Sequence, residues 1–142
     1  MRIAVASDHA GFKLKEMLKE HLAAAGHEVA DCGAASEERS DYPDYAKEAA
    51  SLISKGKAER GILVCGSGIG MCIAANRYKG VRAVVIRDEN DAVVSRQHND
   101  ANAACLGARV TGPDEVRRLV DLFLKTAFEG GRHIARVAKI DI

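Results

Sequence analysis

The sequence lacks the features that would tie it to a nucleic acid or a membrane. Its 142 residues carry 21 Lys and Arg against 20 Asp and Glu, for a formal net charge of +1. Nonspecific nucleic-acid binding needs a basic excess, which is missing. No apolar run approaches the ~18 residues of a membrane span. We therefore expect neither nucleic acid nor membrane among the partners.

The chain also lacks a secretory start and a metal-binding cysteine pattern. Asp8 and His9 interrupt the first apolar stretch too soon for a signal peptide. The cysteines are Cys32, Cys65, Cys72 and Cys105. No two of them have Cys-x-x-Cys spacing, and no Cys/His cluster has the spacing of zinc ligands. The sequence predicts a cytoplasmic protein with reduced thiols and no metal site.

There is no repeat, linker or low-complexity tract, and 47% of the residues are hydrophobic. A length of this order suits one core, so residues 1–142 are expected to form a single domain. Short β-branched runs alternate with helical patterns. Strands are expected at 3–6, 27–32, 61–65, 81–86 and 103–107, and helices at 12–25, 42–55, 71–76, 88–97 and 113–128. Gly26 suits a helix end and Pro43 a first turn, while Gly130-Gly131 precedes a polar tail.

This alternation predicts an α/β fold, a doubly wound Rossmann-like sandwich with a five-stranded parallel sheet. Ligands of such folds bind beyond the carboxyl ends of the strands. Residues 66–70, Gly-Ser-Gly-Ile-Gly, occupy such a position between a strand and a helix. Glycines there let several backbone N–H groups face one anionic oxygen, although a tight turn is the simpler reading. A dinucleotide fingerprint fails, because Met71 replaces its last glycine.

Cys65 ends the strand before this loop, beside a helix N-terminus that favours a thiolate. It could be a nucleophile or a base, or it could be a buried structural cysteine. Asp8 and His9 follow the first strand and are expected at the same edge, although Asp8 could merely cap a helix. His98 lies near a helix end, where its charge is favoured in any case.

Five segments together resemble the ribose-5-phosphate isomerase B family, in order and over essentially the whole chain. They are Ser7–Phe12, Asp41–Pro43, Cys65–Gly70, Ser95–Asp100 and Glu129–His133. The wider family includes subunits of galactose-6-phosphate isomerase and an allose-6-phosphate isomerase. The resemblance implies reversible conversion of ribose 5-phosphate to ribulose 5-phosphate, in the pentose phosphate pathway and without a cofactor.

The resemblance also implies catalytic roles. Cys65 matches the general base, His98 the residue that opens the sugar ring, and Asn99 a neighbouring substrate contact. The anion hole around the enediolate matches Gly66, Ser67, Gly68, Ile69 and Gly70, with Ser67 able to shuttle a proton between oxygens. Another branch of the family has a glutamate base where this chain has Met71. Methionine cannot accept a proton, which places the chain with the cysteine branch.

Further matches concern the phosphate and the assembly. Asp8 and His9 match a pair that contacts sugar and phosphate, and Arg109, Arg132 and Arg136 match phosphate-binding arginines. Arg132 and Arg136 are four residues apart, hence on one face if their segment is helical. The resemblance implies a homodimer, or a dimer of dimers, with each active site at the subunit interface.

Two alternatives remain open at the level of the sequence. A six-carbon substrate, allose 6-phosphate or galactose 6-phosphate, would use the same chemistry, because loop packing decides the length of the pocket. A nonenzymatic nucleotide-binding module could be built on the same sheet. We further expect Cys65 and His98 of one site to come from different subunits.

Overall fold

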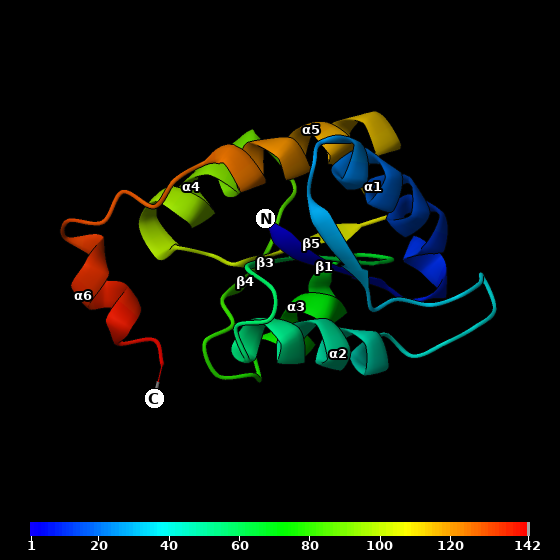
Figure 1. Cartoon of the computed structure of the whole chain (residues 1–142), viewed down its shortest axis with the longest axis horizontal. Helices are drawn as coiled ribbons and strands as arrows, with labels where there is room; N and C mark the ends of the chain where they lie inside the picture. The colour runs from blue at the N-terminus through cyan, green and yellow to red at the C-terminus, as the bar shows by residue number, and fades with distance from the viewer. Residues whose placement is uncertain (142) are drawn as a thin grey trace.

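The computed structural model describes residues 1–141, in which strands alternate with helices (Figure 1). The strands are β1 (Arg2–Ser7), β2 (Glu28–Asp31), β3 (Arg60–Cys65), β4 (Ala83–Val85) and β5 (Ala103–Gly107). The helices are α1 (Phe12–Ala24), α2 (Tyr42–Ser54), α3 (Ile69–Ala75), α4 (Glu89–Asn99), α5 (Pro113–Lys125) and α6 (His133–Ala138), with a 3-10 turn η1 (His9–Gly11). No helix within residues 1–141 is long and apolar enough to cross a bilayer.

The five strands form one parallel sheet in the order β2-β1-β3-β5-β4. This confirms the predicted Rossmann-like α/β fold. The chain winds outward from β1 to β2 and then crosses back to β3 on the other side of β1. The loops after β1 and β3 therefore diverge and leave a crevice between them, which is where such folds bind ligands.

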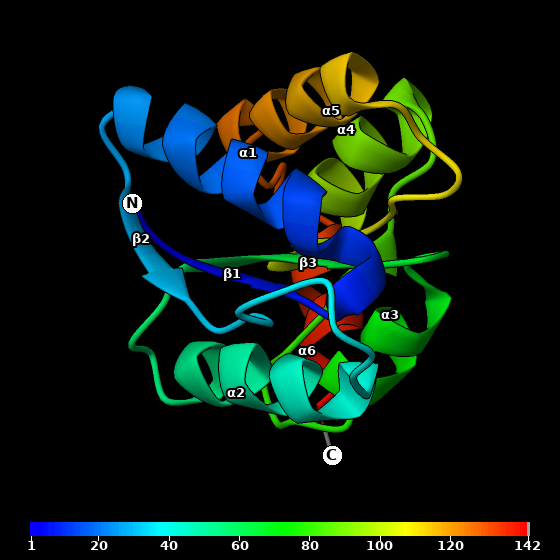
Figure 2. The same ribbon diagram turned by 90° about the vertical axis from the view of Figure 1, so that its right-hand side faces the viewer.

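The two faces of the sheet are covered differently. Helices α1, α4 and α5 lie on one face and α2 and α3 on the other (Figures 1 and 2). The first face packs large side chains such as Leu18, Leu119 and Phe123. The second is rich in alanine, with Ala46 and Ala49 of α2 fully buried. Small side chains let α2 lie close to the sheet.

The structure corrects several predicted boundaries and adds a helix. The helix expected to reach residue 128 ends at Lys125, because Thr126 is extended and its carbonyl accepts a hydrogen bond from Arg96 Nε, 3.1 Å away. The strand expected at 81–86 shortens to 83–85, since the N–H of Arg82 donates to the Asn102 side chain at 2.7 Å. The polar tail after Gly131 contains α6.

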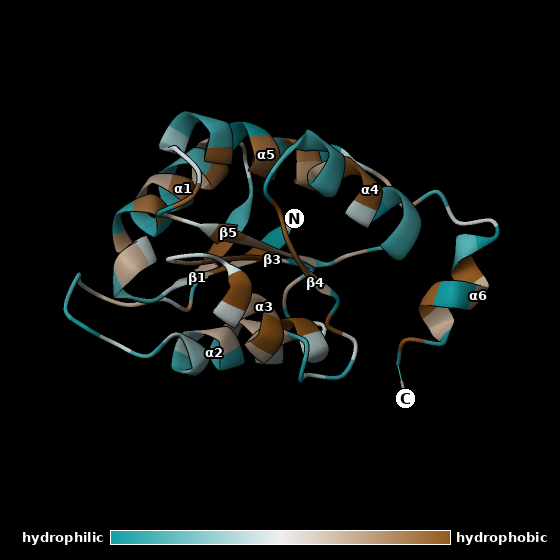
Figure 3. Ribbon diagram, turned by 180° about the vertical axis from the view of Figure 1, so that it is seen from behind, coloured by the Kyte–Doolittle hydropathy of each residue, from teal (hydrophilic) through white to brown (hydrophobic). Residues whose placement is uncertain are grey.

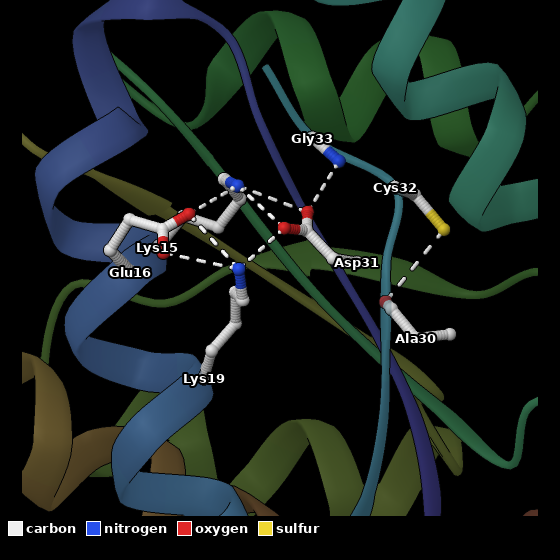
Figure 4. Close-up of polar contacts among 7 residues, drawn as sticks. All are labelled: Lys15, Glu16, Lys19, Ala30, Asp31, Cys32 and Gly33. Atoms are coloured by element: carbon white, nitrogen blue, oxygen red, sulfur yellow. Dashed lines mark hydrogen bonds and ion pairs between the residues drawn. The ribbon is translucent and has the colours of Figure 1, made fainter. Parts of the chain in front are cut away.

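A buried ion pair anchors the end of β2. The side chain of Lys15 is 1% exposed, and its Nζ lies 3.0 and 2.9 Å from the two carboxylate oxygens of Asp31 (Figure 4). Lys19 also donates to Asp31, and the same carboxylate accepts from Gly33 N–H at 2.9 Å. Burial opposes ionisation of Asp31, but the hydrogen bonds from Lys19 and Lys15 prevail and hold its pKa below the ordinary value. The network fixes the start of the loop formed by residues 33–41.

Candidate active site

A pocket lies at the carboxyl edge of the sheet, at the crevice between the loops after β1 and β3. It is lined by Asp8, Tyr42, Cys65, Gly66, Ser67, Gly70 and Arg109. The predicted meeting of Asp8 with Cys65 is therefore confirmed.

Cys65 closes β3 and is 4% exposed. The N–H of Gly68 donates to its Sγ at 3.1 Å. Gly68 reaches this position with φ of +80°, and a Cβ there would lie 3.0 Å from the backbone of Leu106. Only glycine combines this backbone conformation with such a close approach to β5. The glycine-rich loop thus holds a hydrogen-bond donor against the sulfur.

The loop amides fall into two groups. Gly68 N–H donates to Cys65, and Ile69 N–H donates to Ser67 Oγ at 3.2 Å. The amides of Gly66, Ser67 and Gly70 donate to no protein group within residues 1–141. All three residues line the pocket. Their amides are therefore available to an oxyanion there.

Tyr42 is a pocket residue to which the sequence assigned no role. Its ring lies over Gly70, where a Cβ would approach the ring within 2.6 Å. Tyr42 belongs to the Asp41–Pro43 motif at the start of α2, so the motif was the available signal. The ring forms a wall of the pocket beside the glycine loop.

Asp8 and His9 lie at the start of η1. Asp8 Oδ1 accepts from Ala10 and Gly11 N–H at 3.0 and 3.3 Å, so the capping role considered for it is real, and Asp8 lines the pocket as well. His9 Nδ1 lies 3.2 Å from both the backbone nitrogen and the carbonyl oxygen of Ser40. These contacts hold the imidazole ring against the loop formed by residues 33–41.

Arg109 follows β5 and lies against the glycine loop. A Cβ at Gly66 would lie 3.0 Å from Arg109 Nη1. The Arg109 side chain is exposed, so its guanidinium borders the open side of the pocket. An anionic group entering beside Cys65 would meet this positive charge.

The remaining cysteines, Cys32, Cys72 and Cys105, lie away from this pocket. Burial and nearby carboxylates raise the pKa of Cys32 to about 11. The Cys105 thiol donates a hydrogen bond to Cys72, which lowers the pKa of Cys72 to about 7. The same bond, together with burial, raises the pKa of Cys105. Cys72 is half-buried against the alanine-rich core, and its sulfur lies 3.3 Å from the Ala83 carbonyl of the edge strand β4. None of these three lines the pocket.

A second pocket lies where α4 meets α6. It is lined by His98, Asn99, His133, Arg136, Val137 and Ile140. His98 is in the last turn of α4, as predicted, and Arg136 projects from α6. Arg132 stands at the N-cap of α6 and is exposed. The structure thus gathers His98 and Asn99 with Arg136, with Arg132 close by in the chain.

His133 is a further residue that the sequence left without a role. Its ring stacks on that of His98, with centroids 4.4 Å apart and planes 14° apart. Burial, His98, Arg132 and Arg136 lower the pKa of His133. Its signal in the sequence was its place in the Glu129–His133 motif, directly after Arg132.

These two pockets are at opposite edges of the sheet. Cys65 pairs with Gly107 at the carboxyl end of β5, whereas His98 and Asn99 precede the first residue of β5, Ala103. The strand alone separates these edges by about 13 Å, at ~3.3 Å per residue. Figure 1 shows α6 standing beside the end of α4, away from the glycine loop. One chain does not bring Cys65 and His98 together.

Comparison with known proteins gives a consistent result. Residues 3–140 match the family model described as Ribose/Galactose Isomerase. Ribose-5-phosphate isomerase B of Escherichia coli is 46% identical over 98% of this chain and 93% of its own. The Thermotoga maritima ribose 5-phosphate isomerase structure is 50% identical, with a TM-score of 0.95 over 99% of this chain and 97% of its own. The Mycoplasma genitalium ribose-5-phosphate isomerase B structure, with bound ribulose 5-phosphate, is 43% identical, with a TM-score of 0.94 over 98% and 93%.

Proposed function

The chain belongs to the ribose/galactose isomerase family, and from that premise we propose that it interconverts ribose 5-phosphate and ribulose 5-phosphate through an enediolate. One observation carries the proposal. A buried thiol, Cys65, faces a pocket whose glycine loop offers amide donors and whose rim offers the Arg109 guanidinium. The thiol can remove a proton from the carbon beside a carbonyl, and the amides and the guanidinium can stabilise the oxyanion that results.

The proton transfer is assigned to Cys65. In the open-chain sugar its thiolate takes the proton from C2, and the electron pair moves onto the carbonyl oxygen at C1. The same thiol then returns the proton to C1, and the other oxygen becomes the ketone. Ser67 Oγ moves a proton between the two oxygens. The amides of Gly66, Ser67 and Gly70 stabilise the negative oxygen, a contribution of about 3–4 kcal/mol for a good donor.

Ring opening and phosphate binding are assigned to the other residues. His98 transfers a proton to the ring oxygen, and Asn99 contacts the substrate beside it. His9, Asp8 and Arg109 contact the sugar phosphate from the carboxyl edge. The remaining phosphate ligands are Arg132 and Arg136. Remote binding of the phosphate aligns the reacting carbons with the thiol.

These assignments require two copies of the chain, and we propose a homodimer or a dimer of dimers. Cys65 of one copy would then meet His98, Arg132 and Arg136 of the other. Support comes from apolar side chains left exposed at both edges. Those next to the glycine loop are Ile69, Ile73 and Val110, and those of the α6 segment are Ile134 and Ile140. Figure 3 shows hydrophobic residues on both α3 and α6. A dimer that covers these surfaces completes the site.

An isomerase assay across pentose and hexose phosphates tests the function. We expect the kcat/KM for ribose 5-phosphate to exceed the values for allose 6-phosphate and galactose 6-phosphate. A preference for a hexose phosphate would replace the substrate but keep the chemistry. Thermal stabilisation by AMP or NAD, with no turnover of any sugar phosphate, would overturn the proposal in favour of a nucleotide-binding module. The predicted cytoplasmic location goes with this metabolic role.

A further inference from the structure

Three side chains with metal-binding atoms converge where α4 meets α6. The Nε2 atoms of His98 and His133 lie 4.0 and 3.9 Å from Oε2 of Glu129. One ligand atom from each residue can be chosen so that all lie within 4.8 Å of one another. Two imidazoles and a carboxylate suit first-row transition metals, which bind such ligands in many proteins.

One of these candidate ligand atoms, Nε2 of His133, is buried without a hydrogen bond in the part of the chain that the structure describes. His133 is 5% exposed, and its Nε2 has no hydrogen-bond partner within residues 1–141. A buried polar atom left without a partner costs roughly 1–3 kcal/mol. Such atoms are rare in native proteins, and a ligand is one explanation for them. This one lies 3.9 Å from the Glu129 carboxylate, in the centre of the cluster.

A small movement would bring the three ligands around one ion. Metal–nitrogen distances are about 2.0–2.1 Å, so two ligands of one ion lie within roughly 4 Å of each other. The stacked rings must also tilt, because a lone pair lies in the plane of its ring. The side chains of His98 and Glu129 are 39% and 49% exposed and have room to turn. His133 would stay in place and serve as the fixed ligand.

The surroundings limit the affinity. Arg132 and Arg136 flank the cluster and repel a cation, whereas Glu129 attracts it. An imidazole–imidazole–carboxylate set binds Ni²⁺, Zn²⁺ or Cu²⁺ more strongly than Mg²⁺ or Ca²⁺, which prefer oxygen. The expected ligand is therefore a dication of the later transition series.

We propose that His98, Glu129 and His133 form a binding site for a first-row transition-metal dication, and that the bound ion inhibits the enzyme by occupying His98. The metal-binding part of this proposal depends only on the geometry of these three side chains. The inhibition rests on the proposed function, because it requires His98 to open the sugar ring.

Calorimetric titration of the full-length protein with Ni²⁺ tests the binding. We expect one ion per chain in the wild-type protein. Glu129→Gln and His133→Asn should each weaken this binding by at least about tenfold, since even outer-shell changes at metal sites cost 10–100-fold. Glu129 is half-exposed, so its substitution keeps the test valid if His133→Asn fails to fold. Unchanged affinity in Glu129→Gln would overturn the site, as would the absence of Ni²⁺ binding to the wild-type protein.

Three control variants remove other places where Ni²⁺ could bind. His21→Asn breaks a histidine–carboxylate pair with Asp121 that has no third such ligand among residues 1–141. His27→Asn removes the ring beside the N-terminal amine, 3.2 Å away. Cys72→Ser removes the half-buried thiol with the lowered pKa. All three should bind Ni²⁺ like the wild type, and loss of the ion in any one would overturn the assignment.

The activity assay separates the site from the proposed function. Wild-type isomerase activity should fall as the calorimetric site fills, and the Ni²⁺ concentration for half-inhibition should rise at least about tenfold in Glu129→Gln. Each variant is compared with its own activity without metal. A site that fills without inhibition would overturn the role of His98 and leave the metal site standing. Inhibition without the calorimetric site would overturn the metal site and leave the isomerase assignment intact.

Discussion

The two edges of the sheet are built in contrasting ways. At the carboxyl edge, Cys65 ends a buried central strand, and the loop after it is fixed by Gly68 against the backbone of β5. At the amino edge, His98 and Arg136 are carried by the last turn of α4 and by α6, a helix of six residues. The first edge is rigid because the core fixes it. The second takes its geometry from a peripheral helix, on which the apolar side chain of Ile134 is exposed.

This difference separates two kinds of catalytic requirement. A proton acceptor must lie within hydrogen-bond distance of the carbon that loses its proton, which suits a side chain on a buried strand. Phosphate binding acts at a greater distance from the reacting carbons. In the proposed homodimer, residues supplied across the interface would meet that need, and activity would then require the dimer.

The largest effect should come from the rigid edge. Cys65→Ala removes the proposed base, so kcat should fall by about 10²–10⁴, while the melting temperature and the affinity for sugar phosphate change little. Steady-state isomerase kinetics and calorimetry measure these quantities. Iodoacetamide should inactivate the wild-type enzyme as well, and the substrate should protect it.

Cys72→Ser is the matched control for that variant. Cys72 packs, like Cys65, on the alanine-rich face of the sheet, and its lowered pKa makes it partly a thiolate near neutral pH. Activity close to wild type in Cys72→Ser, together with the loss in Cys65→Ala, would separate the base from a merely reactive cysteine. More than about a tenth of wild-type kcat in Cys65→Ala would exclude general-base catalysis by that residue.

The next effect tests whether the two edges work together across subunits. Cys65→Ala and His98→Asn proteins are each expected to be nearly inactive. After subunit exchange, about half the dimers are mixed, and each mixed dimer has one doubly damaged and one intact site. Activity should therefore recover to roughly a quarter of wild type. Absence of recovery, with exchange confirmed by mass spectrometry, would show that each site lies within one subunit.

The carboxyl edge could be predicted from the sequence more fully than the amino edge. The five strands, the α/β class and the meeting of Asp8 with Cys65 follow from local patterns and from the rule for parallel sheets. The role of Tyr42 as a wall depends on how α2 packs over Gly70, and the stack of His98 on His133 depends on where α6 docks. Such contacts join residues distant in the sequence, and neither periodicity nor motif spacing determines them. The early end of α5 likewise depends on a tertiary hydrogen bond from Arg96 to Thr126.

A smaller effect is expected from the phosphate ligands of the amino edge. Arg136→Ala should lower kcat/KM for ribose 5-phosphate by about 10–100-fold, because a hydrogen bond to a charged group contributes about 1.5–3 kcal/mol. Arg136→Lys should restore only part of this, since an ammonium cannot make the bidentate contact. Binding of unphosphorylated ribose is the control. An equal loss for both sugars would show that Arg136 does not contact the phosphate.

The smallest effect on activity should come from the buried ion pair behind the carboxyl edge. Lys15→Met leaves Asp31 with Lys19 and Gly33 N–H, so we expect a loss of about 2 kcal/mol in unfolding free energy, below the 3–5 kcal/mol of a fully buried pair. Urea denaturation measures this loss, and the kcat of the folded enzyme should change no more than a few-fold. Lys19→Met, which removes a more exposed partner of the same carboxylate, should cost less than Lys15→Met.

The pH dependence of the Lys15→Met defect shows whether the ion pair is its cause. The pKa of Asp31 lies below its ordinary value of 3.8 in the folded protein. A lowered carboxyl pKa contributes stability above the unfolded value, and this is lost as pH falls through the folded pKa. The stability difference between wild type and Lys15→Met should therefore be constant near neutral pH and shrink below about pH 4. A difference that stayed constant into acid would assign the loss to packing of the Lys15 methylenes against Gly33 rather than to charge. The rigidity of the carboxyl edge would then rest on packing alone.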